Sequence, residues 1–116
     1  PVIQGNSKPL RFSKWEPGCH LKKGPFDVQI PVHSDYFIPE VLIIPLVGFD
    51  KKGGRLGYGG GFYDRTLESL RSQQATLAIG FAYSEQEFEN LPLEPTDQKL
   101  DVIVTERHII ELTHSK

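Results

Sequence analysis

A glycine-rich segment between an apolar run and a helical pattern constrains this chain more than any other feature. Residues 49–65 read FDKKGGRLGYGGGFYDR, and six of the chain's 11 glycines fall within nine positions of this segment. The apolar run Val41–Ile44 comes before it, and a helical pattern over residues 63–71 follows it. Glycine backbones approach an anion closely, and a helix N-terminus carries partial positive charge. A strand, a glycine-rich loop and a helix in this order therefore indicate a phosphate-binding site.

The segment differs from two common nucleotide motifs. A Walker A loop that starts at Gly54 would need lysine where Gly60 stands. A dinucleotide fingerprint that starts at Gly57 would need glycine where Phe62 stands. Two or three glycines suit a turn, whereas six cost more conformational entropy than a simple connection requires. We therefore interpret the segment as a ligand-binding loop in which Arg55 offers a bidentate contact to phosphate.

Two aspartates near this loop are candidate metal ligands. Asp64 lies in the first turn of the predicted helix, where a carboxylate stabilises the helix dipole. Beside a polyphosphate, the same carboxylate would repel the ligand unless Mg²⁺ bridged the two, which makes a metal role the better explanation if a nucleotide binds. Asp97 lies in a proline-containing loop, where a turn-forming role and a ligand role are both open.

The remaining pattern predicts an α/β domain with a mostly parallel sheet. Three apolar runs are typical of strands buried on both faces, and they cover residues 41–44, 75–82 and 101–105. Ser84 with Glu87 three residues later predicts a short helix that opens with a capping box. Alternation over residues 10–15 predicts a further strand, and residues 26–32 predict an extended edge segment because they include Pro31.

Size and composition limit the classes of protein to consider. A chain of 116 residues fits one domain. Thirteen basic and 15 acidic residues give a net charge of −2, so we expect no nucleic-acid partner. The apolar runs are too short to span a bilayer, so we expect no membrane partner. Cys19 is the only cysteine, which favours a reducing, cytoplasmic compartment. The sequence leaves the oligomeric state open, and we expect a monomer.

The segment and its neighbours together resemble one family. FDKKGGRLGYGGGFYDR, followed by LAIGFAYSEQ, LPLEPTDQKLD and VIVTE, is similar to the 5-formyltetrahydrofolate cyclo-ligases, also called methenyltetrahydrofolate synthetases. The similarity runs from Leu42 to Glu106, and residues 11–33 resemble the upstream region of bacterial members. It implies a three-layer α/β sandwich with a mostly parallel sheet, like the fold of phosphosugar isomerases and CoA transferases. It also implies that residues 1–116 are the C-terminal portion of a longer cyclo-ligase with an N-terminal helical region.

The resemblance further implies an activity and a set of site residues. Family members cyclise 5-formyltetrahydrofolate to 5,10-methenyltetrahydrofolate with ATP and Mg²⁺, releasing ADP and phosphate through a phosphorylated formyl group. Arg55 matches a catalytic position, and Asp64 and Asp97 match the magnesium ligands. The positions that match the ATP-binding loop are Arg55, Leu56, Gly57, Tyr58, Gly59, Gly60, Gly61, Phe62 and Tyr63. The positions that match folate contacts are Tyr58, Gly59, Gly60, Gly61 and Phe62.

Two other functions are compatible with the same loop. One is a non-enzymatic module that binds nucleotide or folate, and the other is an enzyme resembling phosphosugar isomerases. An isomerase would need an acid–base residue at the glycine loop and no ATP, so ATP dependence separates it from a ligase. Product formation separates the ligase from the binding module. We expect the 116 residues alone to be inactive, because nothing in them matches the family's N-terminal region.

Overall fold

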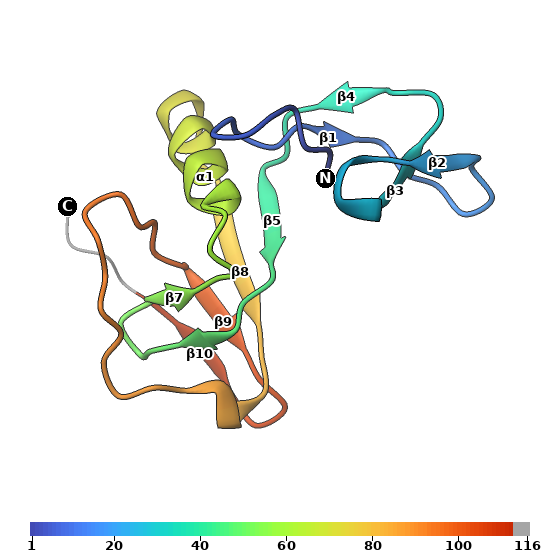
Figure 1. Ribbon diagram of the computed structural model, residues 1–116. Coiled ribbons are helices and arrows are strands. Elements are labelled where there is room, and N and C mark those ends of the chain that lie inside the picture. The colour runs from blue at the N-terminus through green and yellow to red at the C-terminus, as the bar shows by residue number, and fades with distance from the viewer. Residues whose placement is uncertain (113–116) are drawn as a thin grey trace.

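The computed structural model describes residues 1–112, which form a four-stranded sheet with one long helix against it (Figure 1). The strand order is β10 (Ile109–Glu111), β9 (Val102–Val104), β8 (Leu77–Phe81) and β5 (Val41–Ile44). Strands β5, β8 and β9 are parallel, and β10 is an antiparallel edge strand. Helix α1 (Phe62–Gln73) connects β5 to β8. The predicted α/β class is confirmed, with a mixed sheet in which parallel pairs predominate.

The parallel strands are buried on one face only, which corrects our prediction that both faces are buried. Along β5, Leu42 and Ile44 are buried, whereas Val41 and Ile43, which alternate with them, are 53% and 58% exposed. Leu67 of α1 belongs to the same core cluster as Leu42 and Ile44. A continuous apolar run indicates two apolar faces, but the described residues supply a long helix for only one of them.

Close packing on the helix side requires one particular glycine. A Cβ atom placed on Gly80 of β8 would lie 2.8 Å from Leu100 and 2.9 Å from Leu46, which is too close for any larger residue without a shift. Both leucines are buried in the core. The loop that precedes β9 therefore crosses the same face of the sheet as α1.

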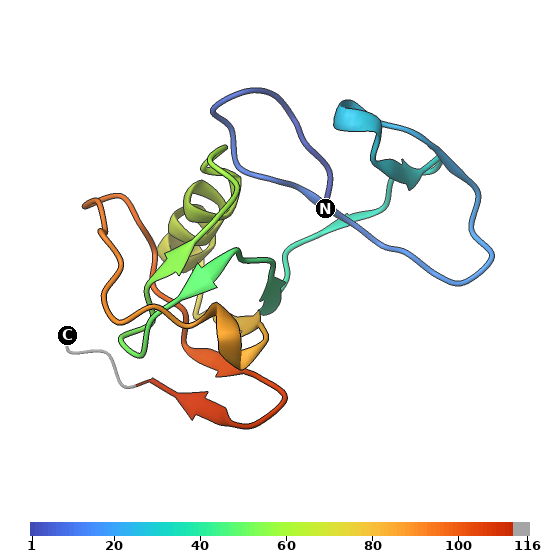
Figure 2. The same cartoon turned by 60° about the horizontal axis from the view of Figure 1, so that its bottom comes forward.

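Residues 1–39 form two small antiparallel pairs beside the main sheet (Figure 2). Strand β1 (Phe12–Ser13) pairs with β4 (Tyr36–Phe37), and β2 (Leu21–Lys23) pairs with β3 (Gln29–Pro31). A single 3₁₀ turn, η1 (Pro25–Asp27), lies between β2 and β3. The strand predicted over residues 10–15 is thus shorter, and the extended segment predicted over 26–32 begins with a helical turn. Pro31 lies in a strand with one partner, which confirms its predicted edge position.

A hydrogen-bond relay joins this N-terminal part to the helix. The backbone N–H of Leu10 donates to the hydroxyl oxygen of Thr66 over 2.8 Å. The same hydroxyl donates to the carbonyl of Phe62 over 2.6 Å. Thr66 and Leu10 are buried, so this relay fixes the first segment of the chain against the start of α1.

A hairpin and a short turn complete the fold. Strands β6 (Gly48–Phe49) and β7 (Arg55–Leu56) form the hairpin that leads into the glycine loop. In η2 (Ser84–Gln86), the N–H of Tyr83 donates to the Gln86 side chain, whereas the Ser84 hydroxyl donates to Glu106. The predicted capping box at Ser84 and Glu87 is therefore wrong, because the turn begins one residue earlier, with Tyr83 and Gln86. Within residues 1–112 no helix combines the length and the apolar character that crossing a membrane requires.

Candidate active site

The glycine-rich segment has two structural parts, and only the second faces the candidate site. Gly53 and Gly54 form the turn of the β6–β7 hairpin around buried Asp50. The N–H of Gly54 donates to Asp50 Oδ1 over 2.9 Å, and a Cβ atom on Gly54 would lie 2.7 Å from Asp50 Oδ2. These two glycines therefore serve the hairpin, which corrects our interpretation of all six as one ligand loop.

Residues 57–61 form the loop that leads from β7 into α1. Gly59 and Gly61 have φ angles of 95° and 69°, in the left-handed region that favours glycine. Gly61 is the N-cap of α1 and offers no side chain to the first-turn N–H groups. A helix start with no side-chain cap, preceded by an open glycine loop, suits an anionic ligand.

Arg55 is held at the centre of the site by groups on three sides. Its side chain is only 7% exposed. Nε donates to the carbonyl of Pro45 over 2.9 Å, Nη1 lies 3.8 Å from Asp64 Oδ1, and the guanidinium carbon lies 5.5 Å from the ring centre of Tyr63. Burial lowers the pKa of Arg55, while the charge of Asp64 opposes this shift. The ordinary pKa of arginine is so high that the Arg55 guanidinium stays cationic near neutral pH despite this shift.

The two predicted metal ligands are both positioned by backbone donors. Asp64 Oδ1 accepts the N–H of Gln98 over 3.0 Å, and Asp97 Oδ2 accepts the N–H of Glu94 over 2.9 Å. Asp97 is thus a turn-forming residue, and its side chain also lines the same pocket as Asp64. No group of three or more histidine, cysteine or carboxylate side chains that could hold a metal occurs among the described residues. Two carboxylates do fit Mg²⁺ that is also held by phosphate oxygens.

A polar pocket of about 530 Å³ lies on one side of the loop. Its lining carries two guanidinium groups and four carboxylates, from Arg55, Arg65, Asp64, Glu68, Glu94 and Asp97. The rest of the lining comes from the glycine loop and from the segment around Asp97, namely Leu56, Gly57, Tyr58, Gly59, Gly61, Leu91, Pro92 and Thr96. This mixture of fixed charges suits a charged ligand that arrives with a cation.

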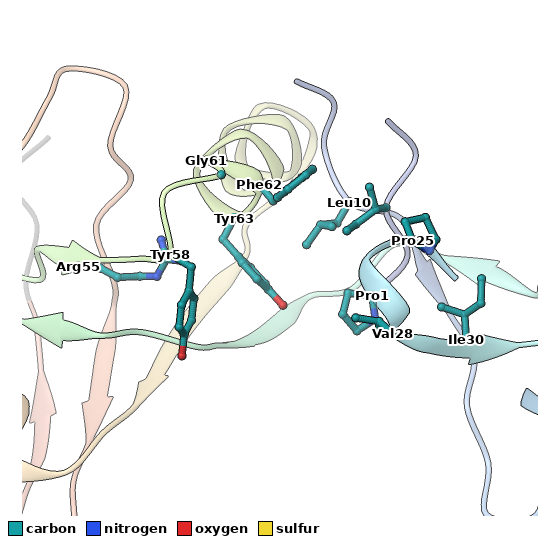
Figure 3. Close-up of a pocket in the computed structure, with 12 residues that line it drawn as sticks. Pro1, Leu10, Pro25, Val28, Ile30, Arg55, Tyr58, Gly61, Phe62 and Tyr63 are labelled. Atoms are coloured by element: carbon teal, nitrogen blue, oxygen red, sulfur yellow. The ribbon is translucent and has the colours of Figure 1, made fainter. Parts of the chain in front are cut away.

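An apolar pocket of about 180 Å³ lies on the other side of the same loop (Figure 3). Residues from the N-terminal part form one wall, namely Pro1, Ile3, Leu10, Pro25, Val28 and Ile30. Gly60, Phe62 and Tyr63 contribute to the other wall. Burial raises the pKa of Tyr63, and the nearby charge of Arg55 opposes the shift. The Tyr63 phenol is therefore protonated near neutral pH and available as a hydrogen-bond donor.

Every site residue predicted from the sequence lines one of these two pockets. Arg55, Tyr58 and Gly61 line both of them. Figure 3 shows Tyr58 and Tyr63 between Arg55 and the N-terminal wall. The assignment of individual residues to ATP, folate or metal stays a prediction.

Sequence reasoning missed Arg65 and the whole apolar wall. Arg65 lines the polar pocket, its guanidinium carbon lies 5.0 Å from the ring centre of Phe62, and its buried Nε has no hydrogen-bond partner within residues 1–112. Its position directly after Asp64, at the end of the glycine-rich segment, could have identified Arg65 from the sequence as a further candidate for this site. Leu10, Val28 and Ile30 carried no such signal, because they reach the loop only through tertiary packing.

Comparisons with known proteins agree on one family. A sequence model described as the 5-formyltetrahydrofolate cyclo-ligase family matches residues 1–106. A 5-formyltetrahydrofolate cyclo-ligase of Haemophilus influenzae is 41% identical over 111 residues, which cover 90% of this chain and 59% of that protein.

Two solved structures are similar as well. The NMR structure of Aquifex aeolicus 5,10-methenyltetrahydrofolate synthetase superposes with a TM-score of 0.76 at 36% identity, covering 100% of this chain and 58% of the other. A 5,10-methenyltetrahydrofolate synthetase from Mycoplasma pneumoniae superposes with a TM-score of 0.54 at 42% identity, covering 66% and 46%. The chain thus spans 59% of the Haemophilus protein and 58% of the Aquifex structure.

Proposed function

Because the chain belongs to the 5-formyltetrahydrofolate cyclo-ligase family, we propose that its two pockets serve the ATP-dependent cyclisation of 5-formyltetrahydrofolate to 5,10-methenyltetrahydrofolate. The observation that carries this proposal is the contact between a polar and an apolar pocket at Arg55 and Tyr58. ATP is highly charged, whereas a pterin ring is uncharged and offers its faces for stacking on aromatic and apolar side chains, so the two substrates need walls of different chemistry. A phosphoryl group passes between them only if the two pockets adjoin.

The reaction balances in two steps. The formyl oxygen attacks the γ-phosphorus of ATP, a new P–O bond forms, the β–γ bridging bond breaks, and ADP leaves. The N10 amine then attacks the activated formyl carbon and loses its proton. The C–O bond to phosphate breaks, and phosphate leaves the five-membered methenyl ring. No nucleophilic side chain is required, because phosphoryl transfer depends mainly on positioning and electrostatic stabilisation.

The chain's own residues supply both the positioning and the electrostatic stabilisation. Arg55 donates to the transferred phosphoryl group, where its planar fork stabilises the developing charge. The backbone of residues 57–61 and the start of α1 bind the phosphates. Tyr58 and Phe62 position the folate ring by stacking, because each lines the apolar pocket.

Asp64 and Asp97 hold Mg²⁺ in this proposal. Mg²⁺ held by these two carboxylates would offset the negative charge of the ATP phosphates. The lining of the polar pocket supports the assignment, since its four carboxylates exceed its two guanidinium groups. This excess repels a free nucleotide, and a divalent cation held between the carboxylates and the phosphates would reduce that repulsion.

The relatives are longer than this chain, which covers 59% of the Haemophilus protein and 58% of the Aquifex structure. We expect turnover to need the remaining length found in relatives, so that the 116 residues alone bind substrates weakly without forming product. The three-layer arrangement related to phosphosugar isomerases and CoA transferases belongs to this longer form. The relatives reported above bear names of the cyclo-ligase activity, which favours the ligase over a binding module or an isomerase.

The decisive experiment measures methenyl product from 5-formyltetrahydrofolate with purified full-length protein. ATP and Mg²⁺ are omitted in turn, and the 116-residue chain is assayed in parallel. We expect product only when both are present and only from the longer protein. Product without ATP would contradict the ligase assignment. Product from the 116 residues alone would contradict the requirement for additional polypeptide.

A further inference from the structure

Arg65 is the second arginine of the polar pocket, and its surroundings differ from those of Arg55. The Arg55 side chain already contacts the Pro45 carbonyl and Asp64. Within residues 1–112, Arg65 forms no ion pair, and its buried Nε has no acceptor. A guanidinium carries five N–H donors, and a buried donor without a partner costs free energy. The fold therefore places a cation in this pocket without pairing it with one of the pocket's own carboxylates.

The Arg65 guanidinium lies at the start of α1. Side chains of a helix lean toward its N-terminus, so Arg65 reaches back one turn to Gly61. A Cβ atom on Gly61 would lie 2.7 Å from Nη1 of Arg65, so the N-cap glycine leaves the space that the guanidinium occupies. The helix start carries partial positive charge, which makes it an unfavourable place for a cation unless an anion joins it.

Phe62 positions this guanidinium without using its hydrogen-bond donors. The guanidinium carbon of Arg65 lies 5.0 Å from the ring centre of Phe62. Such a contact depends on the charge and the flat face of the guanidinium, so the terminal N–H groups stay available to a ligand. Arg65 lines the polar pocket and is absent from the lining of the apolar one. Its donors therefore serve a ligand on the charged side of the loop.

An anion with several oxygens, such as a phosphate chain, fits this cation. We propose that Arg65 binds the phosphates that ATP keeps when it becomes ADP, an assignment that rests on the proposed function. Arg55 lines both pockets and can reach the group that passes between them. Arg65 lines only the polar pocket, so it binds the phosphates that are not transferred. The planar fork of an arginine suits bidentate contact with such oxygens.

Two substitutions of Arg65 and one matched control make the proposal testable. Arg65→Gln removes the charge and keeps a good helix former, whereas Arg65→Lys keeps the charge and loses the planar fork. Arg11→Gln is the control. The guanidinium carbon of Arg11 also lies over an aromatic ring, 3.6 Å from the centre of Tyr36, but Arg11 lines neither pocket. Thermal unfolding verifies that each variant is folded.

Calorimetry with the full-length protein measures the affinities for ADP with Mg²⁺, for tripolyphosphate and for adenosine. Arg65→Gln should weaken the binding of ADP and of tripolyphosphate at least tenfold, because charge-assisted hydrogen bonds are lost. Arg65→Lys should weaken it less, and Arg11→Gln should leave it within twofold. Adenosine has no phosphate and should bind all four proteins equally. In steady-state kinetics, Arg65→Gln should raise KM for MgATP by a similar factor and leave KM for 5-formyltetrahydrofolate within twofold.

Three results would overturn the proposal. The first is an ADP affinity of Arg65→Gln within twofold of the wild type. The second is failure of the wild-type protein to bind ADP or tripolyphosphate at millimolar concentrations. The third is a rise in KM for 5-formyltetrahydrofolate alone, which would assign the guanidinium to the carboxylates of folate.

This proposal and the ligase assignment fail separately, because ADP binding needs no turnover. ADP affinity that depends on Arg65, without any ATP-dependent product, would support the phosphate contact and contradict the ligase. ATP-dependent product together with an unchanged ADP affinity of Arg65→Gln would support the ligase and overturn the role of Arg65.

Discussion

The two pockets share one loop but are built in different ways. The polar pocket takes its charged groups mainly from residues 55–68 and from residues 94 and 97. The apolar pocket takes half of its lining from residues 1–30, which reach the loop from a separate part of the fold. One short motif therefore presents charged groups on one side and aromatic rings on the other.

This difference separates three groups of residues by their expected effects. Arg55, Tyr58 and Gly61 lie on the boundary and contribute to both pockets. Asp64 lines only the polar pocket, and Val28 lines only the apolar one. Substitutions at the boundary should affect both substrates in the full-length enzyme. Substitutions on either side should affect one substrate and spare the other.

Arg55→Ala should have the largest effect. We expect kcat to fall about 10²–10³-fold, because the variant loses a preorganised cation at the phosphoryl group. It also leaves Asp64 without its ion-pair partner and the Pro45 carbonyl without its donor. Steady-state kinetics with each substrate varied in turn would measure the loss.

Arg55→Lys is the matched control because it keeps the charge but removes the planar fork. A partial loss, smaller than that of the alanine variant, is expected. If both variants retained normal kcat and KM for both substrates, Arg55 would have no role at the boundary. Thermal unfolding of both proteins separates loss of fold from loss of function.

Asp64→Asn tests the polar pocket alone. Losing a charged ligand should raise KM for MgATP by about 30-fold, equivalent to about 2 kcal/mol, while KM for 5-formyltetrahydrofolate stays nearly unchanged. Higher Mg²⁺ should recover part of the activity. Glu68→Gln, which removes a carboxylate from the same pocket one turn later, serves as the control and should change KM for MgATP less. An unchanged Mg²⁺ titration curve for Asp64→Asn would refute the metal role.

Much of the lining of the polar pocket comes from one local segment of the sequence. The positions from Arg55 to Asp64 are contiguous, and a loop between a strand and a helix places them together with few alternatives. Asp97 was a weaker prediction, and it reaches the pocket through a turn that its own carboxylate stabilises. Helix α1 was also predicted closely, because its apolar residues follow the helical period.

The apolar pocket and the burial of the sheet depended on contacts that no local pattern encodes. Leu10 reaches the site because its backbone donates to Thr66, 56 positions later in the chain. The runs at 41–44 and 77–81 have the composition of strands covered on both sides, but burial depends on what packs against them. From the sequence, Gly53 and Gly54 looked like part of the ligand loop. Their role in the hairpin depends on Asp50, and that contact is visible only in the fold.

Val28→Asp tests the apolar pocket and should have the smallest effect of the three. Val28 is already 49% exposed, so the substitution should leave the fold intact and place a charge beside the proposed folate site. We expect KM for 5-formyltetrahydrofolate to rise about tenfold, equivalent to about 1.4 kcal/mol, with KM for MgATP unchanged. Val32→Asp is the control, since Val32 is 41% exposed and lies outside the lining of this pocket. Equal effects of the two variants on folate KM would mean that the N-terminal wall does not contact folate, because a general disturbance of residues 1–39 would then explain both.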